Sequence, residues 1–236
     1  MNLTADQRRD VMQWDFRTWS RALPFWHQAL QGRPMPQNAL AVGERQGGLS
    51  LWLALNGHRV VCSDLRPVPP EARALHVRHG MADRIEYRVV DISGTDLPDA
   101  SFDVAAFKSV IGALGTKEAQ ARAVAELHRV LRPGGILLFA ENLEATRVHR
   151  VLRKRFTAWQ GYWRYLRWPQ DRDLFARFKN CDFRMFGLLA NLGRSEAQRA
   201  LLSRVDDLLM PVLPSAWRYA VAGVCHKDGP PDMNPA

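Results

Sequence analysis

The sequence predicts an α/β protein with a mainly parallel sheet and helices on both of its faces. Three observations lead to this prediction. In residues 39–64 an apolar strand enters a glycine-bearing turn and a helix, and a second strand then ends on an acid. Further apolar segments alternate with helical segments, a pattern that needs right-handed crossovers between parallel strands. A chain of 236 residues, 47% of them hydrophobic, is long enough for one sizeable core.

Residues 1–36 are predicted to form a helical preamble to this sheet. Apolar positions in 6–31 recur at helical spacing until Pro24 interrupts them, which predicts two helices before the first strand. The aromatic residues of the segment are Trp14, Phe16, Trp19 and Trp26. We favour a stripe that packs against the sheet, and the alternative is a lid that keeps water away from a site.

The turn after the first strand carries Gly43, Gly47 and Gly48, and the second strand ends on Asp64. Glycines let the backbone approach a ligand closely, and a carboxylate about 20 residues beyond the first glycine can accept hydrogen bonds from two ribose hydroxyls. The simpler explanation is a strand-to-helix turn that requires positive φ. The combination indicates half of a crevice for an adenosine-containing cofactor.

The following segments continue the alternation. After a Pro-rich break at 67–70, a helix is expected over 71–80, and IEYRVVDIS (85–93) reads as a third strand ending on Asp91. LPDASFDVAAFKS (97–109) reads as a polar turn and a fourth strand, and ELHRVLRPGGILLFAEN (126–142) as a helix, a Pro-Gly-Gly turn and a fifth strand. In this order, residues 38–142 resemble a class I S-adenosylmethionine (SAM)-dependent methyltransferase of the small-molecule family often called type 11. The resemblance implies a Rossmann-like, seven-stranded, mainly parallel sheet.

The resemblance also implies SAM as the cofactor, with the Asp64 carboxylate on the ribose and Asp91 on the adenine amino group. The residues expected to bind SAM are Gly43, Glu44, Gly47, Gly48, Asp64, Leu65, Asp91, Ile92, Lys108 and Ser109. The first turn departs from the family pattern, because Ala41 stands where the family has an acid and Arg45 where it has the middle glycine. Glu44, three residues after Ala41, would take over the task of the missing acid.

Methyl transfer from SAM is an in-line displacement that depends on positioning, and a hydroxyl acceptor also benefits from a general base. His149 is the first candidate for this base, since the pKa of histidine lies near neutral pH, and Glu141 is the second. Each has a structural alternative: His149 as a packing or surface residue, and Glu141 as a hydrogen-bonded carboxylate that fixes the next loop. Lys108 would contact an anionic substrate or hold the local backbone. Because the fourth strand ends on lysine and serine, no metal site is predicted.

Basic and aromatic residues interleave in 144–170, as in RVHRVLRKRFTAWQGYWRYLRW. This composition suits stacking on sugars or bases, cation–π contacts or a lipid interface, and it also suits an apolar helix face beneath a basic one. The residues expected to contact the substrate are Asn142, Trp159, Trp163, Arg164 and Tyr165. A net charge of +9 and a pI of about 10.1 favour an anionic partner, whether nucleic acid, an acidic membrane surface or a phosphate-bearing substrate.

The C-terminal part completes the predicted domain, which spans 37–228. Residues 178–189 suit a sixth strand, 193–213 a helix capped by Ser195, and 217–227 a final strand. The resemblance implies that the last two strands form an antiparallel edge pair, with the helix inserted between them. The tail at 229–236 is expected to be disordered.

Cysteine spacing and hydropathy predict the compartment. The three cysteines, Cys62, Cys181 and Cys225, lie far apart and are predicted to be reduced, buried thiols. No apolar run suits a signal peptide or a membrane span, which predicts a cytoplasmic protein without a membrane span.

These observations predict a metal-independent SAM-dependent methyltransferase that acts on a hydroxyl of a small molecule or sugar. By analogy, its acceptor is a glycan or natural product, including an anionic or lipid-linked one, and peripheral membrane contact is compatible with it. An RNA methyltransferase competes on charge, but no RNA-binding module accompanies the domain. A non-catalytic partner protein competes because Ala41 and Arg45 alter the cofactor turn.

Overall fold

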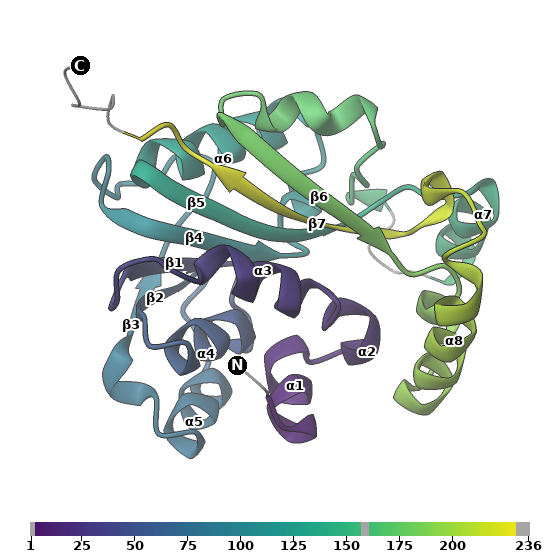
Figure 1. The fold of residues 1–236 in the computed structure, drawn as a ribbon, viewed down its shortest axis with the longest axis horizontal. Coiled ribbons are helices and arrows are strands. Elements are labelled where there is room, and N and C mark those ends of the chain that lie inside the picture. The colour runs from purple at the N-terminus through teal and green to yellow at the C-terminus, as the bar shows by residue number, and fades with distance from the viewer. Residues whose placement is uncertain (1–2, 157–160, 230–236) are drawn as a thin grey trace.

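A seven-stranded sheet in the order β3-β2-β1-β4-β5-β7-β6 forms the centre of the computed structural model, which describes residues 3–156 and 161–229 (Figure 1). Its strands are β1 (Asn38–Val42), β2 (Arg59–Asp64), β3 (Ile85–Val89), β4 (Phe102–Lys108), β5 (Leu131–Asn142), β6 (Asn180–Phe186) and β7 (Ala220–His226). The pairs from β3 to β5 are parallel, while β7 runs antiparallel to both β5 and β6. The predicted fold class, including the antiparallel pair at the edge, is confirmed.

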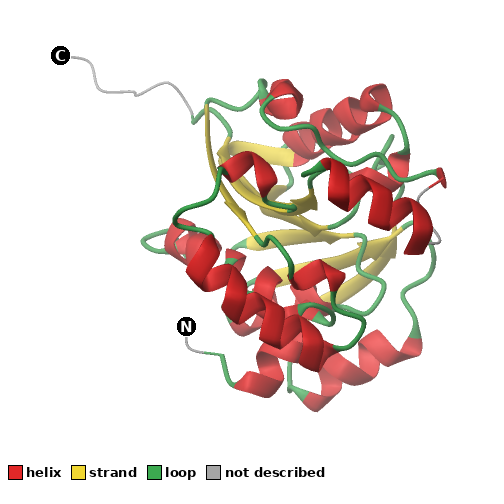
Figure 2. Cartoon of the chain, turned by 90° about the vertical axis from the view of Figure 1, so that its right-hand side faces the viewer, coloured by secondary structure: helices red, strands yellow, loops and turns green. Residues whose placement is uncertain are grey.

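Helices cover both faces of the sheet (Figures 1 and 2). The α-helices are α1 (Ala5–Met12), α2 (Phe16–Trp19), α3 (Ala22–Leu30), α4 (Gly48–Leu55), α5 (Pro70–Arg78), α6 (Lys117–Val130), α7 (Arg147–Phe156) and α8 (Glu196–Leu209). Short 3₁₀ turns are η1 (Ala82–Arg84), η2 (Ile111–Leu114), η4 (Gln170–Phe175), η5 (Ala190–Leu192) and η6 (Ser215–Trp217). The α8 helix follows its Ser195 cap and comes between β6 and β7 along the chain, as the sequence predicts.

The core has two layers, one on each face of the sheet. Along β1, Ala39 and Ala41 belong to the apolar cluster on one face, whereas Leu40 and Val42 belong to the cluster on the other. This alternation follows from the two-residue period of side chains along a strand. Because both faces are covered, β1 is buried from Ala39 to its end, and ligands have access only at the ends of the strands.

The N-terminal preamble has a different number of helices from the number predicted, but most of its aromatic side chains pack against the core as predicted. It forms three helices rather than two, because Pro24 lies in the first turn of α3, where the missing N–H has no intrahelical partner to lose. Trp19 and Trp26 are fully buried in the first core layer, and the Trp26 ring lies 5.7 Å from that of Trp52. Trp14 remains 37% exposed beside the carboxyl ends of the strands.

One predicted strand boundary was wrong. Strand β3 ends at Val89, two residues before Asp91. The Asp91 carboxylate accepts a hydrogen bond from the Ser93 amide at 2.8 Å, which turns the chain away from the sheet. Such local bonds of aspartate compete with the β ladder and favour a turn.

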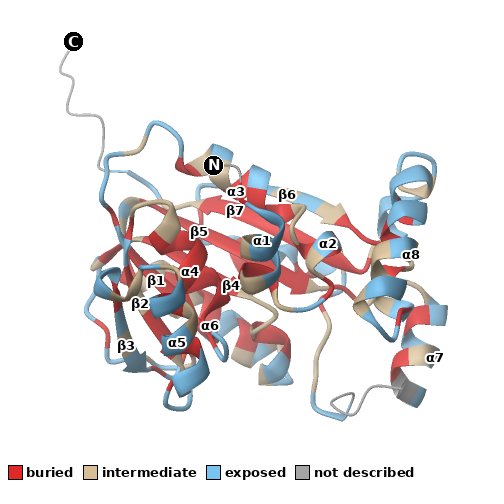
Figure 3. Ribbon diagram, turned by 90° about the horizontal axis from the view of Figure 1, so that it is seen from below, coloured by how far each residue is buried: buried red, intermediate tan, exposed pale blue. Residues whose placement is uncertain are grey.

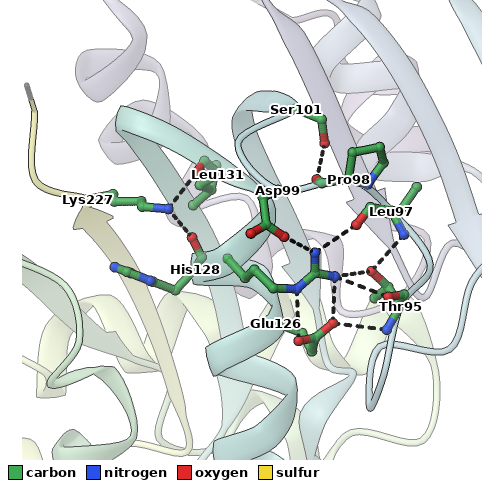
Figure 4. A network of polar contacts seen from close by, with 10 residues as sticks. Thr95, Leu97, Pro98, Asp99, Ser101, Glu126, His128, Leu131 and Lys227 are labelled. Carbon is green, nitrogen blue, oxygen red and sulfur yellow. Dashed lines mark hydrogen bonds and ion pairs between the residues drawn. The ribbon is translucent and has the colours of Figure 1, made fainter.

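Arg129 of α6 links the two segments that carry most of the family resemblance (Figure 4). Its guanidinium donates to the Leu97 carbonyl at 2.8 Å and to Asp99 at 2.5 Å, and it pairs with Glu126 of its own helix at 2.8 Å. Arg132 of β5 holds Asp103 of β4 at 2.9 Å. Both arginines act where β4 and β5 begin, so these segments stabilise the amino-terminal edge of the sheet.

The prediction of three reduced cysteines was wrong for two of them. Cys181 on β6 and Cys225 on β7 form a disulfide, and their Cα atoms lie 4.1 Å apart. The register of the two antiparallel strands places these residues directly opposite each other. Cys62 on β2 is a buried free thiol.

Candidate active site

The carboxyl ends of β1, β2 and β4 bring the main predicted site residues together. Val42 pairs with Ser63 on one side and with Phe107 on the other. The next residues along the three strands are Gly43, Asp64 and Lys108, so the glycine turn lies between a carboxylate and an ammonium group. In open α/β sheets this edge is where ligands bind.

Asp64 and its neighbours fit an adenosine group. The Asp64 carboxylate accepts a hydrogen bond from the Arg66 amide at 3.2 Å through Oδ1, and its Oδ2 has no protein donor among the residues described. Leu65 exposes 65% of its surface beside it and offers an apolar platform for a base. Asp91 is exposed just beyond β3, the strand that pairs with β2, and Ile92 is buried next to it. Two carboxylates and one apolar platform match ribose hydroxyls, an exocyclic amine and a purine face.

The backbone conformation of the turn and the lack of space for a side chain require glycine at its three glycine positions. Gly43 and Gly47 have φ of +71° and +76°, which side chains rarely adopt. A Cβ on Gly43 would lie 2.3 Å from the Val110 side chain, and a Cβ on Gly47 would lie 2.5 Å from the His76 ring. Gly48 is equally tight, because a Cβ there would approach the Val11 carbonyl to 2.2 Å. Gly47 and Gly48 are buried, so their role here is packing, and Gly43 is the glycine nearest the cofactor edge.

Glu44 points toward the start of α4. Its Oε2 accepts a hydrogen bond from the Ser50 amide at 2.8 Å, and the side chain is 6% exposed. Burial raises the pKa of this carboxyl group. The residue before the helix, Gly47, has no side chain to cap it, so Glu44 supplies an acceptor for one of the free amides of the first turn. This geometry accounts for Glu44 as a helix cap and gives no support to it as a substitute for the acid absent at Ala41.

Glu141, the second candidate base, is a structural carboxylate in this geometry. It is fully buried, and its Oε2 accepts from the Val110 amide at 2.9 Å while Oε1 accepts from the Asn142 amide at 2.7 Å. The Asn142 side chain in turn donates to Ser109 Oγ at 2.7 Å. These bonds fix the loop after β4, which is the alternative role that the sequence allows for Glu141. Since both oxygens are engaged, the geometry does not support it as a base.

His149, the first candidate base, is occupied on both ring nitrogens. Nε2 donates to the Leu188 carbonyl at 2.7 Å, and Nδ1 lies 2.8 Å from the Thr146 hydroxyl. The side chain is 5% exposed, and burial lowers its pKa. A neutral ring with no free nitrogen cannot take a proton from an acceptor, so we do not retain His149 as a catalytic residue.

Lys108 is the titratable group that the geometry favours instead. Its Nζ lies 5.7 Å from the ring centre of Trp14 and 5.5 Å from that of Trp19, and no hydrogen bond from it is found in residues 3–156 and 161–229. Loss of solvent lowers the pKa of Lys108 to about 8, although Glu44, Glu141 and Asp15 oppose this shift. An amine of this pKa is partly neutral near physiological pH and is suited to proton transfer.

Asp15 completes this group of residues. It is fully buried, has φ of 43°, and accepts a hydrogen bond from the Tyr219 hydroxyl at 2.6 Å. Its Oδ1 has no partner among the described residues, and burial raises its pKa to about 6. The sequence does not indicate Asp15 as a site residue, because its partner lies 204 positions away.

Three of the five predicted substrate residues line a cavity of about 270 Å³ next to this edge, and Asn142 is not among its lining residues. Trp163, Arg164 and Tyr165 are among its lining residues, while Trp159 lies outside the described residues. The Trp163 ring packs on Gly112 in the loop after β4, where a Cβ would approach Nε1 to 2.1 Å. Arg164 is engaged by the buried Asp171 at 2.8 Å, so it supports the wall rather than facing the cavity alone.

Arginines give this cavity a positive charge. The Glu144 carboxylate lies 3.3 Å from Arg150 and 3.2 Å from Arg167. Arg153 lies 4.0 Å above the Tyr165 ring and donates to the Leu143 carbonyl at 2.8 Å. Two guanidinium groups therefore pair with one carboxylate and a third lines the same cavity, and this excess of positive charge suits an anionic ligand. Within the described part of the chain, no group of three or more His, Cys, Asp and Glu side chains is arranged to hold a metal ion.

The strand order, the glycine turn and the carboxylates at the ends of β2 and β3 define a class I methyltransferase fold, the class whose methyl donor is SAM. The family model described as a methyltransferase domain matches residues 40–139. Residues 40–139 are therefore similar to the methyltransferase domain of this family, in agreement with the resemblance that the sequence shows.

Solved structures agree with this assignment of the fold. A SAM-dependent methyltransferase from Methanosarcina mazei is 19% identical with a TM-score of 0.63, and the match covers 88% of this chain and 98% of that one. The 1,6-didemethyltoxoflavin-N1-methyltransferase of Burkholderia thailandensis, solved with its substrate and S-adenosylhomocysteine, is 21% identical with a TM-score of 0.61, covering 93% and 82%. The phosphoethanolamine N-methyltransferase 2 of Haemonchus contortus, in complex with SAM, is 15% identical with a TM-score of 0.64, covering 89% and 53%. No curated protein matches the chain.

Proposed function

We propose that this chain transfers the methyl group of SAM to a hydroxyl of a small anionic molecule or sugar, without a metal ion. The observation that carries the proposal is the order Asp64, Gly43, Lys108 along the carboxyl edge of the sheet. Asp64 and Asp91 would hold the adenosine part of SAM at one end of this row. Lys108 lies at the other end, on β4, which pairs with β5, and residues that follow β5 line the arginine-rich cavity. The acceptor would bind between the two.

SAM, when bound, supplies a methyl group that is already electrophilic, so the chain's own residues have to position the acceptor and manage one proton. Lys108 Nζ, in its neutral form, would take the proton from the acceptor hydroxyl as the oxygen gains the methyl group. With a pKa of about 8, roughly a tenth of the amine is neutral at pH 7. General-base assistance of this kind contributes about 10²–10⁴-fold. Trp14 and Trp19 would keep water from the amine.

The choice of oxygen as the atom methylated follows from this base. An amine acceptor carries its own lone pair and needs little help, whereas a hydroxyl is a poor nucleophile until it loses its proton. The names of two structural neighbours describe N-methyltransferases, so nitrogen is the competing acceptor atom. Arg150, Arg153 and Arg167 support an anionic group on the acceptor, such as a phosphate or carboxylate. Surface-polysaccharide or natural-product biosynthesis is the setting that these features suit.

A second candidate function is a non-catalytic partner protein that retains the fold. Two observations favour it: the Val110 side chain lies against Gly43, and Ala41 provides no carboxylate for the amino-acid end of the cofactor. An RNA methyltransferase is a weaker alternative. The overall charge supports it, but the arginine-lined cavity is small for a nucleic acid.

Calorimetric titration of the purified protein with SAM and with S-adenosylhomocysteine tests the proposal. We expect binding that Asp64→Ala abolishes and that Asp83→Ala, an exposed carboxylate on η1, leaves intact. Labelled SAM with panels of sugar phosphates, phenols, amines and short RNAs then identifies the acceptor. If the folded protein binds neither ligand, the non-catalytic role replaces the enzyme. Turnover that depends on an amine or an RNA would move the acceptor assignment accordingly.

A further inference from the structure

The α8 helix turns its apolar side outward. Leu201, Val205 and Leu208 follow one another at the i, i+4, i+7 spacing of a single helix stripe, and they expose 62%, 36% and 78% of their surfaces. The inner side carries the fully buried polar residues Ser203 and Asp206 beside Leu202, which is partly buried against the core. The stripe of Leu201, Val205 and Leu208 therefore lies outside the core, unlike the leucines of an ordinary surface helix.

Hydrogen bonds, together with the partly buried Leu202, attach α8 to the domain without the three outward side chains. The Asp206 carboxylate accepts from the amides of Leu188 at 2.9 Å, Leu189 at 2.8 Å and Ala190 at 3.3 Å. Arg21 donates to the Ser203 hydroxyl at 3.2 Å. Since polar contacts fix the inner side, the exposed leucines are not needed for folding and their exposure calls for another explanation.

The α7 helix repeats this arrangement at the same end of the molecule (Figures 1 and 3). Its inner side carries the buried His149 and Arg153, while Val148 and Val151 expose 62% and 64%. The two helices hold the same residue, because α7 binds the Leu188 carbonyl through His149 and α8 binds its amide through Asp206.

We call these exposed apolar side chains the α7–α8 face and define it as Val148, Val151, Leu201, Val205, Leu208 and the half-exposed Trp217, on helices at the same end of the molecule and on η6. Two exposed arginines accompany it, Arg147 on α7 and Arg204 on α8. Exposed apolar side chains of this number, next to basic ones, mark an interaction surface.

We propose that the α7–α8 face docks the protein on a lipid bilayer that contains anionic lipids. Valines, leucines and a tryptophan bordered by arginines are the composition of helices that lie in the membrane interface. The net charge of +9 attracts the chain to an anionic surface. A symmetric dimer through the same face would place four of these arginines, two from each copy, in one interface, so charge favours the bilayer over a second copy. No helix in the described segments has the length and apolar character to cross a membrane, so the docking is peripheral.

The docked face also adjoins the candidate active site. Glu196 at the start of α8 accepts a hydrogen bond from the Asp15 amide at 2.9 Å, and Arg199 lies 5.9 Å from the Trp14 ring centre. A docked molecule would therefore hold its site close to the headgroups, where a lipid-linked acceptor is found. This last step rests on the proposed function, whereas the docking itself does not.

Co-sedimentation with vesicles tests the docking. We compare vesicles of phosphatidylcholine with vesicles that also contain phosphatidylglycerol, using the wild type, Leu201→Gln/Leu208→Gln and Arg147→Gln/Arg204→Gln. The matched control is Val77→Gln, which changes a 64% exposed valine on α5, at the opposite end of the molecule in Figure 1. SAM titration and thermal unfolding of each variant show that the fold is kept.

We expect binding to the anionic vesicles, weakened about tenfold for each leucine removed and about fivefold for each arginine removed, and unchanged in Val77→Gln. The proposal fails if the wild type does not sediment with the anionic vesicles, or if the leucine variant binds as well as the wild type. It also fails if the wild type is a dimer without vesicle binding and the leucine variant is a monomer. The face is then a contact between two copies of the chain. If the wild type binds anionic vesicles but does not bind SAM, the proposed function is refuted and the proposed docking is supported.

Discussion

Replacing Lys108 by methionine is expected to stabilise the protein while it removes activity. Methionine keeps the length of the side chain and its contact with Trp14 and Trp19, but it has no charge. The folded environment lowers the pKa of Lys108 from 10.5 to about 8, which means that the charged amine is less favourable in the folded chain than in the unfolded one. At about 1.4 kcal/mol per pKa unit, this cost amounts to roughly 3 kcal/mol.

The cost of roughly 3 kcal/mol already includes the opposing attraction of Glu44, Glu141 and Asp15, so it is an upper limit to the gain from the substitution. We expect a net increase of about 1–3 kcal/mol in the free energy of unfolding at pH 7, or roughly 2–4 °C in Tm for each kcal/mol. The sign depends on pH in a defined way. Below about pH 8 both states of the wild type are protonated and the cost is complete, whereas between pH 8 and 10.5 the folded state loses its proton first and the cost disappears.

Urea unfolding of the wild type and Lys108→Met at pH 7 and at pH 10 measures this difference. Lys179→Met, at an exposed position, is the matched control and should change stability by less than about 0.5 kcal/mol. Turnover on the true acceptor should fall by about 10²–10⁴-fold in Lys108→Met. A variant that is less stable than the wild type, or a stability difference that is the same at both pH values, would refute the reasoning about Lys108.

Three further predictions follow from the site and the fold. His149→Phe removes the donor to the Leu188 carbonyl and should destabilise the protein by about 2–3 kcal/mol in urea unfolding, while kcat in a turnover assay stays unchanged. Because burial lowers the pKa of His149, the wild type should also lose stability as pH falls below 6.5. Arg45→Gly restores the family residue, but Arg45 does not adopt positive φ, so calorimetry should show SAM affinity within about threefold of the wild type. Thiol titration of the denatured protein should detect one thiol without reductant and three after reduction, since Cys62 is free and the other two cysteines are bonded.

The sequence places the expected cofactor residues at one edge of the sheet because each of them is local to a strand end. Gly43 follows β1, and Asp64 and Lys108 are the last residues of β2 and β4, so the parallel order of those strands is enough to bring them together. The catalytic assignments could not be predicted in the same way. His149 reads as a free histidine until its partner, the carbonyl of Leu188, is known, and that residue lies 39 positions away.

The same limit applies to the disulfide and to Asp15. Cys181 and Cys225 meet because two antiparallel strands pair in one register, and spacing along the chain contains no signal for that register. Asp15 reaches the site through a left-handed backbone conformation and the hydroxyl of Tyr219. The sequence pattern therefore predicts residues at strand ends, but it does not predict the distant partners of buried polar groups, which only the folded structure shows.

The two segments that identify the family carry little information about activity in this chain. Arg129 and Arg132 bind Leu97, Asp99 and Asp103 at the amino-terminal edge of the sheet, opposite to the edge where the cofactor residues gather. A non-catalytic relative would need these bonds as much as an enzyme does, because they stabilise the fold. Retention of those segments thus does not distinguish the two proposed functions. Asp64 and Lys108 do distinguish them, since Oδ2 of Asp64 and the amine of Lys108 have no hydrogen-bond partner among the described residues and a ligand would explain both groups.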